Sequence, residues 1–402
     1  MNRLVERMAK YDAPQKAREL GVYPYFRTIE SEQDTEVIIN GKKVLMFGSN
    51  SYLGLTNHPR LKEASKAAID RYGSGCAGSR FLNGTLDLHL ELEEKLARFV
   101  GKDEALVFST GYQVNLGVIS SITRRQDHIL LDELDHACII DGTRLSFAKT
   151  KKFRHNDMAD LEKSLQRIDT DGLKMIVVDG VFSMEGDVCK LDKIVELARK
   201  YGANVMVDDA HGLGVLGAGG KGTADHFGLT DEVDLIMGTF SKSLASIGGF
   251  IASDKATINY LKHHARSLIF SASIAPGNAA SVIAALDLIA DQPELIDKVW
   301  HNTKLALDGL RSLGLDTGRT ETPIIPIYVR DNFKTFKLTR MLLEEGIFVN
   351  PVITPAVKPE DSLIRFSLMA SHTEDQIAYA LEKIAKISKV LDLPKLQNAH
   401  AG

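Results

Sequence analysis

Two stretches decide the fold: Asn204-Val-Met-Val-Asp-Asp-Ala-His211 and Asp234-Leu-Ile-Met-Gly-Thr-Phe-Ser-Lys242. Each contains a short apolar run and ends in side chains that can titrate or bind an anion. Short apolar runs that lead into polar residues and then a helical pattern are typical of strands buried on both faces of a parallel sheet. The two stretches therefore predict two strand-to-loop units of an α/β domain.

The same pattern occurs three more times toward the N-terminus. The apolar runs are Ala105–Phe108, His128–Leu131 and Met175–Val178, and each is followed by polar or reactive residues. Ligands of open α/β sheets bind beyond the carboxyl ends of the strands, so all five following segments are expected to meet at one crevice. The fold class is therefore predicted to be α/β, with a mostly parallel central sheet between helices.

Changes in composition and hydrophobic pattern along the chain predict three parts. Residues 1–45 are rich in charge and broken by prolines, which predicts an N-terminal arm. Residues 46–285 contain the five strand units and form the predicted large ligand-binding domain. Residues 286–402 predict a smaller α+β domain, because helical patterns there flank short strands. Helices are expected at 293–313, 334–346 and 374–390, and strands at 324–329 and 362–366.

Composition excludes several classes of protein. The formal net charge of −4 offers no basic groove for a phosphate backbone, so nucleic-acid binding is not expected. The three cysteines lie far apart, which argues against a disulfide framework and a zinc cluster, and no metal is expected. No signal peptide and no membrane-spanning run is evident. We expect a cytoplasmic protein, and peripheral contact with the inner membrane stays open.

One glycine motif points elsewhere and is set aside. Gly212-Leu-Gly-Val-Leu-Gly217 matches the dinucleotide-binding pattern. However, it begins several residues beyond its strand and runs into Ala-Gly-Gly-Lys-Gly instead of an apolar helix. A Gly-x-Ser-x-Gly hydrolase elbow is absent from the sequence.

Lys242 has unusual surroundings for a lysine. It lies between Ser241 and Ser243, with apolar or small residues on both sides. Burial makes an ammonium group costly, and a buried lysine tends toward a lowered pKa or covalent use. The hydroxyls of Thr239 and Ser241 can bind a phosphate from the same turn. The alternative is an exposed lysine at a helix start.

Four further positions suit a flat, phosphorylated ring, and two of them have a clear structural alternative. Asp208 suits an ion pair with a protonated pyridine nitrogen, and His211 would then reach a ring oxygen. The alternative is that Asp208 caps the next turn. Gly111 lies at a strand-to-helix turn whose N–H groups suit a phosphate. His136 either stacks on the ring or is a hydrogen-bonded loop histidine. Taken singly, none of these positions is decisive.

Arg365 stands within the apolar run Leu363-Ile-Arg-Phe-Ser367. A buried arginine needs an anion, and either a substrate carboxylate or a structural ion pair would supply one. The order of phosphate turn, stacking residue, aspartate, lysine and arginine along the chain is more informative than any single residue. It indicates a site for pyridoxal 5′-phosphate (PLP), with Lys242 as the lysine that forms a Schiff base with it.

With these residues in this order, the chain resembles the fold-type I PLP enzymes and, among them, the α-oxoamine synthases. The similarity covers nearly the whole chain, from Asn50 to His372. Its strongest markers are Ser79–Thr85 with His89, Asp208–His211 and Thr239–Lys242. The stretches 46–55, 75–85 and 238–245 are most similar to bacterial members that condense L-serine with palmitoyl-CoA.

The resemblance implies a decarboxylating condensation of L-serine with a long-chain acyl-CoA, palmitoyl-CoA, to 3-ketodihydrosphingosine, the first step of sphingolipid synthesis. Family members that join glycine to acetyl-CoA, or alanine to a pimeloyl thioester, remain alternatives. An aminotransferase is a further alternative, and a catalytically silent partner subunit is expected to lack the lysine at 242. Two departures from the family pattern are Cys138, where a serine is common, and Ala356, which leaves a contact with a partner subunit open.

The resemblance also implies residue roles within a large PLP-binding domain. Lys242 would carry PLP, and His136 would be the second catalytic residue, stacked over its ring. The other cofactor contacts would come from Gly111, Tyr112, Ser183, Asp208, His211, Thr239 and Ser241, and from Ser271 and Ser273 of the partner subunit. Arg365 would bind the substrate carboxylate. Asn50 and Tyr52 would line the site across the interface of a homodimer with shared active sites.

Overall fold

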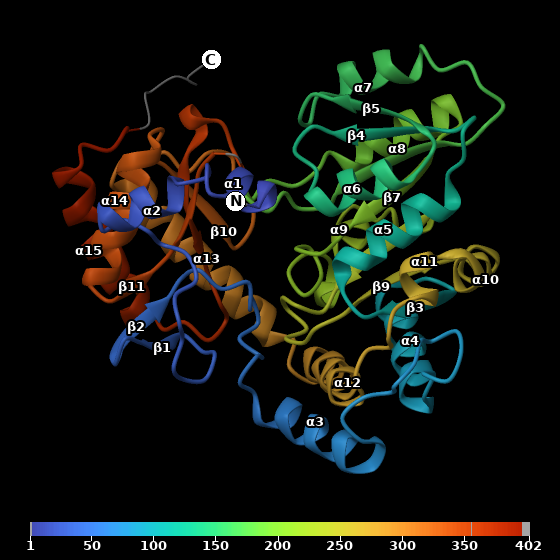
Figure 1. Cartoon of the computed structure of the whole chain (residues 1–402), viewed down its shortest axis with the longest axis horizontal. Coiled ribbons are helices and arrows are strands. Elements are labelled where there is room, and N and C mark those ends of the chain that lie inside the picture. Colours follow the sequence, from blue (N-terminus) through green and yellow to red (C-terminus); the bar gives the residue numbers. More distant parts are fainter. Residues whose placement is uncertain (1, 355, 396–402) are drawn as a thin grey trace.

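A seven-stranded sheet lies at the centre of the larger of two lobes (Figure 1). The computed structural model of the protein describes residues 2–354 and 356–395. The strand order is β3-β9-β8-β7-β6-β4-β5, and only β9 runs antiparallel to its neighbours. The predicted α/β class with a mostly parallel sheet is confirmed. The strands are β3 Glu104–Phe108, β4 His128–Asp132, β5 Lys149–Phe153, β6 Lys174–Asp179, β7 Asn204–Asp208, β8 Leu235–Thr239 and β9 Gly249–Ser253.

Helices cover both faces of this sheet because successive residues of each strand point into different cores. In β6, Ile176 and Val178 belong to one apolar cluster, whereas Met175 and Val177 belong to another. The first cluster includes α4 (Asp87–Val100), α7 (Met158–Leu165), α8 (Leu191–Tyr201) and α12 (Pro276–Asp291), and α3 (Pro59–Tyr72) packs on α12. The second includes α5 (Gly111–Ile122), α6 (Ala137–Leu145), α10 (Lys255–His264) and α11 (Arg266–Ile269).

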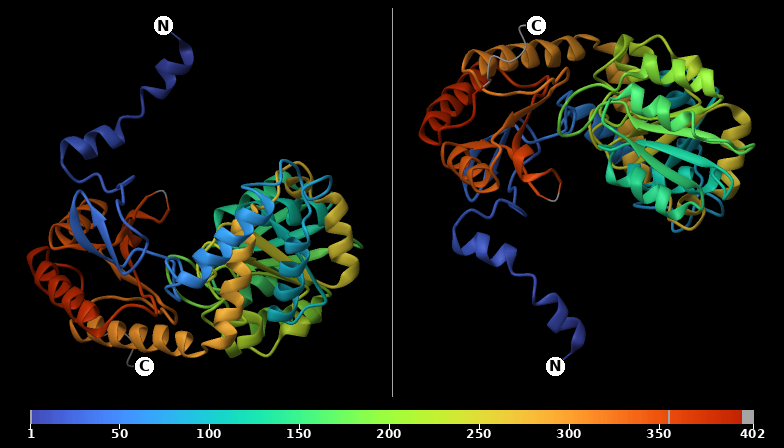
Figure 2. Two further views of the ribbon diagram at one scale, coloured as in Figure 1. Left: turned by 90° about the horizontal axis from the view of Figure 1, so that it is seen from below. Right: turned by 90° about the horizontal axis from the view of Figure 1, so that it is seen from above.

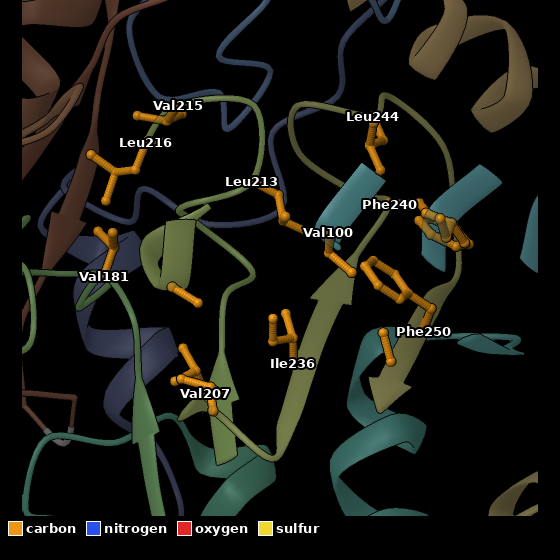
Figure 3. Close-up of a cluster of buried hydrophobic side chains, with 14 of the residues drawn as sticks. Val100, Val181, Val207, Leu213, Val215, Leu216, Ile236, Phe240, Leu244 and Phe250 are labelled. Atoms are coloured by element: carbon orange, nitrogen blue, oxygen red, sulfur yellow. The ribbon is translucent and has the colours of Figure 1, made fainter. Parts of the chain in front are cut away.

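Figure 3 shows part of the first core beneath the loops that follow β7 and β8. Phe240 is fully buried there and stacks on Phe250, with ring centroids 6.0 Å apart. Adjacent residues of an extended segment point to opposite sides, so Phe240 in the core turns Thr239 and Ser241 the other way. This anchoring places two hydroxyl groups at the carboxyl edge of the sheet.

In its described residues, the smaller lobe holds two three-stranded sheets and three long helices. One sheet pairs β1 (Glu36–Ile39) and β2 (Lys42–Met46) with β11 (Ile347–Phe348), and the other has the order β10-β13-β12 (Ile324–Tyr328, Leu363–Ser367, Asn350–Val352). The helices α13 (Glu294–Ser312), α14 (Asn332–Glu344) and α15 (Glu374–Val390) share an apolar cluster with β10 and β13. The three helices predicted in this region are confirmed to within two residues at each end.

Two of the borders expected from the sequence fall inside elements of the structure. Helices α1 (Arg3–Met8) and α2 (Ala13–Glu19) bury none of their residues and extend away from both lobes (Figure 2). The border expected at residue 45 cuts through β2, which pairs with β11 of the smaller lobe, and the border expected at 285 falls inside α12. We propose that the arm ends before β1, that residues 36–46 join the smaller lobe, and that this lobe resumes at α13.

Candidate active site

The loops that follow β3, β4, β6, β7 and β8 meet at one cavity of about 290 Å³. All five segments lie at the carboxyl edge of the sheet, where a parallel sheet presents its ligand sites. The predicted site residues that line the cavity are Gly111, Tyr112, His136, Ser183, Asp208, His211, Thr239, Ser241 and Lys242.

A second cavity of about 570 Å³ adjoins the first and shares four lining residues with it, including Lys242. Asn50 and Arg365 line it from the side of the smaller lobe. Its other walls are largely apolar and come from the arm and from the segment around β12, with Tyr25, Phe26, Phe348, Pro351 and Val352 among them. Lys242 therefore borders both a compact cavity and a wider one that reaches the smaller lobe.

Lys242 lies in the wall between the two cavities and is half-buried. Removal of its ammonium group from water lowers its pKa to about 8, although the carboxylates of Asp208 and Asp179 oppose the change. Among the described residues, no hydrogen bond to Lys242 Nζ is found. The amine is therefore unpaired and about a tenth of it is neutral at pH 7, which suits a nucleophile or a base.

Asp208 ends β7 and is only 3% exposed. Its Oδ2 accepts a hydrogen bond of 2.6 Å from Asn115 Nδ2, and its Oδ1 accepts one of 3.1 Å from the Ala210 N–H. The hydrogen bond from Ala210 is the local turn contact that the sequence offered as a structural alternative. Asp208 makes this contact and also lines the cavity. Asn115 was missed by the sequence reasoning, since nothing in a helical stretch 93 residues away pairs it with Asp208.

His211 forms part of a hydrogen-bonded chain that joins the two lobes. Arg365 Nη2 donates to the Tyr52 hydroxyl at 3.0 Å, so the hydroxyl hydrogen is free for His211 Nδ1, 2.6 Å away. Burial, together with the charges of Lys242 and Arg365, lowers the pKa of His211 well below its usual value. The imidazole is therefore neutral, with Nδ1 as acceptor and its proton on Nε2.

His136 is held in the same tautomer by different contacts. Its Nδ1 accepts the Cys138 N–H at 3.2 Å, which caps α6, and the Cys138 thiol lies 2.8 Å from the same nitrogen. Burial is the main cause that lowers the pKa of His136 and raises that of Cys138, so the ring is neutral and the thiol protonated. With Nδ1 occupied by donors, the proton lies on Nε2. His136 is therefore a hydrogen-bond donor.

The opposite end of the first cavity suits a phosphate group. Gly111 begins α5, where the first N–H groups of a helix lack intrahelical partners, and Thr110 caps only the N–H of Gln113. The Thr239 and Ser241 hydroxyls lie 3.1 Å apart beside this turn. A Cβ on Gly111 would lie 2.7 Å from Thr239 Oγ1, so only glycine leaves this space open.

Arg365 lies on β13 and is 5% exposed. Its guanidinium donates to the Ser183 carbonyl at 2.6 Å, to Ser367 Oγ at 2.7 Å and to the Tyr52 hydroxyl. No carboxylate within the described residues forms an ion pair with it, so the structural ion pair offered by the sequence as an alternative is not observed there. Asn50 Oδ1 is also buried without a hydrogen-bond partner in that part of the chain. The second cavity thus contains a cation that lacks an anion.

Ser271 and Ser273 do not line either cavity. Ser271 Oγ accepts from Gln113 Nε2 at 3.2 Å, and the Ser273 N–H donates to the Gly78 carbonyl at 2.9 Å. Tyr52 is fully buried behind the cavities and contacts His211 within one chain. Among the described residues, no three His, Cys, Asp or Glu side chains are grouped to hold a metal ion.

Comparison with known proteins agrees with this geometry. The model of the aminotransferase class I and II family matches residues 42–384. The chain is 60% identical to a serine palmitoyltransferase of Bacteroides ovatus, over 98% of this chain and 100% of that one. It is 46% identical to an 8-amino-7-oxononanoate synthase of Petrotoga mobilis, over 94% and 96% of the two chains.

The fold is similar to that of a solved structure of SPT with PLP as an internal aldimine. The TM-score is 0.95 at 33% sequence identity, with coverage of 98% of this chain and 100% of that one. The family match spans both lobes, and the relatives match from end to end. The chain belongs to the aminotransferase class I and II family and, within it, to the α-oxoamine synthases.

Proposed function

We propose that the protein is a PLP-dependent acyltransferase of the serine palmitoyltransferase type. It would condense L-serine with palmitoyl-CoA, with loss of CO2, to 3-ketodihydrosphingosine in sphingolipid synthesis. The observation that carries the proposal is the position of the unpaired Lys242 amine between two cavities. One cavity contains the N-terminus of α5, which suits a phosphate, and the other contains an arginine without an anionic partner. The similarity to serine palmitoyltransferases over nearly the full chain supports the choice of substrates.

The residues of the first cavity fit PLP. Gly111, Tyr112, Thr239 and Ser241 would bind the phosphate through N–H and hydroxyl donors. Asp208 would hold a proton on the ring nitrogen, and the Nε2–H of His211 would donate to the ring oxygen. His136 would pack over the ring, with Ser183 at its edge. When bound, PLP supplies an electron sink that stabilises negative charge on the substrate Cα.

Lys242 and His136 would act on the substrate with opposite proton roles. The Lys242 amine, with its pKa lowered to about 8, would take the Cα proton of the amino acid. The Nε2–H of His136 would donate to a substrate oxygen, either of the carboxylate or of the thioester carbonyl. Since the proton on Nε2 is fixed by the cap of α6, this donor is oriented before the substrate arrives.

Arg365 would bind the amino-acid carboxylate, as a planar guanidinium suits a carboxylate. Asn50 would add a polar contact through its unpartnered oxygen. The apolar walls contributed by Phe26, Phe348 and Val352 suit an acyl chain better than the short acetyl group. This observation favours a long-chain thioester over acetyl-CoA, whereas pimeloyl thioester with alanine remains the second candidate, because 8-amino-7-oxononanoate synthases are also relatives.

The test is a comparison of substrates with the purified, PLP-loaded protein. L-serine, glycine and L-alanine would each be added while the absorbance of the cofactor is recorded, and CoA release would then be measured with acetyl-, pimeloyl- and palmitoyl-CoA. We expect the highest kcat/KM for L-serine with palmitoyl-CoA, and none for Lys242→Ala. Preference for alanine with pimeloyl-CoA would overturn the proposal in favour of the second candidate.

We further propose that two copies form a homodimer with shared active sites. Ser271 and Ser273 lie outside the cavities of their own chain, beside exposed apolar residues that include Phe81, Leu82 and Phe270. A second copy would cover this surface, and the two serines of each copy would then reach the cavity of the other copy. Light scattering would report the mass, and Phe270→Asp should reduce the protein to a monomer that binds PLP more weakly. A monomeric wild type would contradict the proposal.

We propose that the protein acts in the cytoplasm with peripheral contact to the inner membrane. None of the described helices has the length and apolarity needed to cross a bilayer. The contact would come from α1, where Leu4, Val5 and Met8 are exposed and Arg3 and Arg7 lie close by in sequence. Flotation with anionic vesicles should carry the wild type upward and leave Leu4→Glu/Met8→Glu behind; equal flotation of both would refute the role of α1.

A further inference from the structure

His155 lies outside both cavities, in the loop that follows β5, and holds two carboxylates at once. Its Nδ1 lies 3.0 Å from Asp132 Oδ1 at the end of β4, and its Nε2 lies 2.9 Å from Asp187 Oδ2. The ring also meets Phe182 edge to face, with centroids 4.4 Å apart. Asn156 reinforces the pair, because its N–H donates to Asp132 and its Nδ2 to Asp187.

Both ring nitrogens face carboxylates, so both must donate and the ring must be an imidazolium. Burial alone would lower the pKa of His155, but the hydrogen bonds to Asp132 and Asp187 outweigh it and raise the pKa to about 10. The cation is thus retained throughout the physiological range. A neutral ring would leave one carboxylate against a lone pair, which is repulsive.

Asp187 belongs to a short hairpin formed by residues 181–188. Val181 bridges Val188, the Phe182 N–H donates to the Asp187 carbonyl at 3.0 Å, and the Gly186 N–H donates to the Phe182 carbonyl at 2.9 Å. His155 holds this 181–188 hairpin from the side of the larger lobe. From the other side, the Thr322 hydroxyl donates to the Gly186 carbonyl at 2.8 Å, just before β10 of the smaller lobe.

The tip of the 181–188 hairpin contacts the proposed carboxylate-binding arginine. The Ser183 carbonyl accepts 2.6 Å from Arg365 Nε, and Met184 lines the second cavity. This carbonyl fixes one edge of the guanidinium, and Ser367 Oγ and the Tyr52 hydroxyl fix the rest, so all three acceptors together set its plane. Movement of the 181–188 hairpin would therefore rotate Arg365 away from its substrate.

We propose that His155 is a positioning residue: by bridging Asp132 and Asp187 it fixes the 181–188 hairpin, and through the Ser183 carbonyl it orients Arg365 toward the amino-acid carboxylate. This inference rests on the proposed function for the role of Arg365. The structural part, from His155 to the hairpin, is independent of any substrate. His155 touches neither cavity, so its effect on the reaction is indirect.

The test compares His155→Gln with wild type in two measurements on the full-length, PLP-loaded protein. Hydrogen–deuterium exchange of the peptide spanning 180–189 should be faster, because Phe182 and Gly186 N–H bonds open more often. The dissociation constant of L-serine, from the absorbance titration, should rise about tenfold, the scale on which residues coupled through a network act. KM should rise by the same factor, while kcat and PLP affinity change less than about twofold.

His301→Gln is the matched control, since His301 pairs with Glu374 at 2.8 Å on an exposed surface far from the hairpin in sequence. It should leave exchange of 180–189 and serine affinity unchanged. Asp187→Asn provides a second variant in case His155→Gln folds poorly, and it should raise the serine dissociation constant similarly. The double variant should be no worse than the poorer single variant, because both remove one interaction.

Three results would overturn the inference or parts of it. Unchanged exchange in His155→Gln would exclude the clamp on the 181–188 hairpin. Faster exchange with unchanged serine affinity would exclude the positioning of Arg365. Multiplication of the two single effects in the double variant would show that His155 and Asp187 act separately. If the wild type binds glycine or alanine instead of serine, the proposed function fails, and the same comparison applies to the carboxylate of that amino acid.

Discussion

Replacing Tyr52 with phenylalanine removes one oxygen from the chain that joins Arg365 to His211. The ring that remains fills the same space, so packing of this fully buried residue is retained. Two hydrogen bonds disappear, the one of 3.0 Å from Arg365 Nη2 and the one of 2.6 Å to His211 Nδ1. Tyr52 is only 1% exposed, so water has no direct path to replace the hydroxyl.

The cost follows from the two groups left without partners. A buried hydrogen-bonding group without a partner costs about 1–3 kcal/mol, and the variant creates two of them. We expect a loss of about 3 kcal/mol after relaxation, or roughly 4 °C in the melting temperature of a chain this long. His211 also loses the contact that keeps its proton on Nε2. We therefore expect the dissociation constants of PLP and L-serine each to rise about tenfold.

The assay is thermal unfolding of the cofactor-free protein, followed by absorbance titrations with PLP and L-serine. Tyr328→Phe is the control, because Tyr328 is half-buried and its hydroxyl makes no hydrogen bond within the described residues. A melting temperature for Tyr52→Phe within about 1 °C of this control, with both affinities unchanged, would refute the reasoning. It would mean that the hydrogen bonds linking Arg365, Tyr52 and His211 contribute nothing measurable to stability or to ligand binding.

Further predictions concern the lysine and the cysteine of the site. Borohydride reduction of the PLP-loaded wild type should add the cofactor mass to the peptide containing Lys242, and Lys242→Ala should gain none; mass elsewhere in the wild type would contradict the assignment. Because burial lowers the pKa of Lys242 to about 8, the amine is mostly protonated below that pH, so PLP should attach faster as pH rises, with a midpoint near 8. A midpoint above pH 10 would indicate an exposed lysine. Cys138→Ser keeps a donor to His136 Nδ1 and should change kcat less than about twofold, whereas Cys138→Val should lower it about tenfold; equal kcat values would exclude this donor.

Local patterns predicted the strand units well, because their residues are neighbours in sequence. The five apolar runs became β3, β4, β6, β7 and β8, and their following loops meet at one cavity. The exceptions have physical reasons. β5 is an edge strand of sequence Lys-Thr-Lys-Lys-Phe in which only Phe153 is buried, so it lacks an apolar run. β9 directly follows the Lys242 loop, so in the sequence its residues were interpreted as part of the apolar segment after Lys242 and not as a separate strand.

Contacts between distant residues could not be predicted from spacing. Tyr52 and His211 are 159 positions apart, and Arg365 is 313 positions from Tyr52, so no local pattern links them. Asn115 looked like one polar residue of a helix, and His155 was not singled out at all. In both cases the partner is an aspartate at the end of another strand. The sequence therefore predicts the residues that line the cavity better than those that hold them in place.

The loop of Lys242 differs from the other loops of the site in how it ends. It leaves β8 at Thr239 and returns at Gly249 on the adjacent antiparallel strand β9, whereas other loops of the site run into helices. Three hydrogen bonds between backbone groups close it, from Phe240 N–H to Gly248 O, Ser246 N–H to Phe240 O and Ala245 N–H to Lys242 O. Both ends are thus pinned to the rigid centre of the sheet. The amine must therefore move by rotation about its own side-chain bonds, so repeated turnover needs no opening of the backbone that carries it.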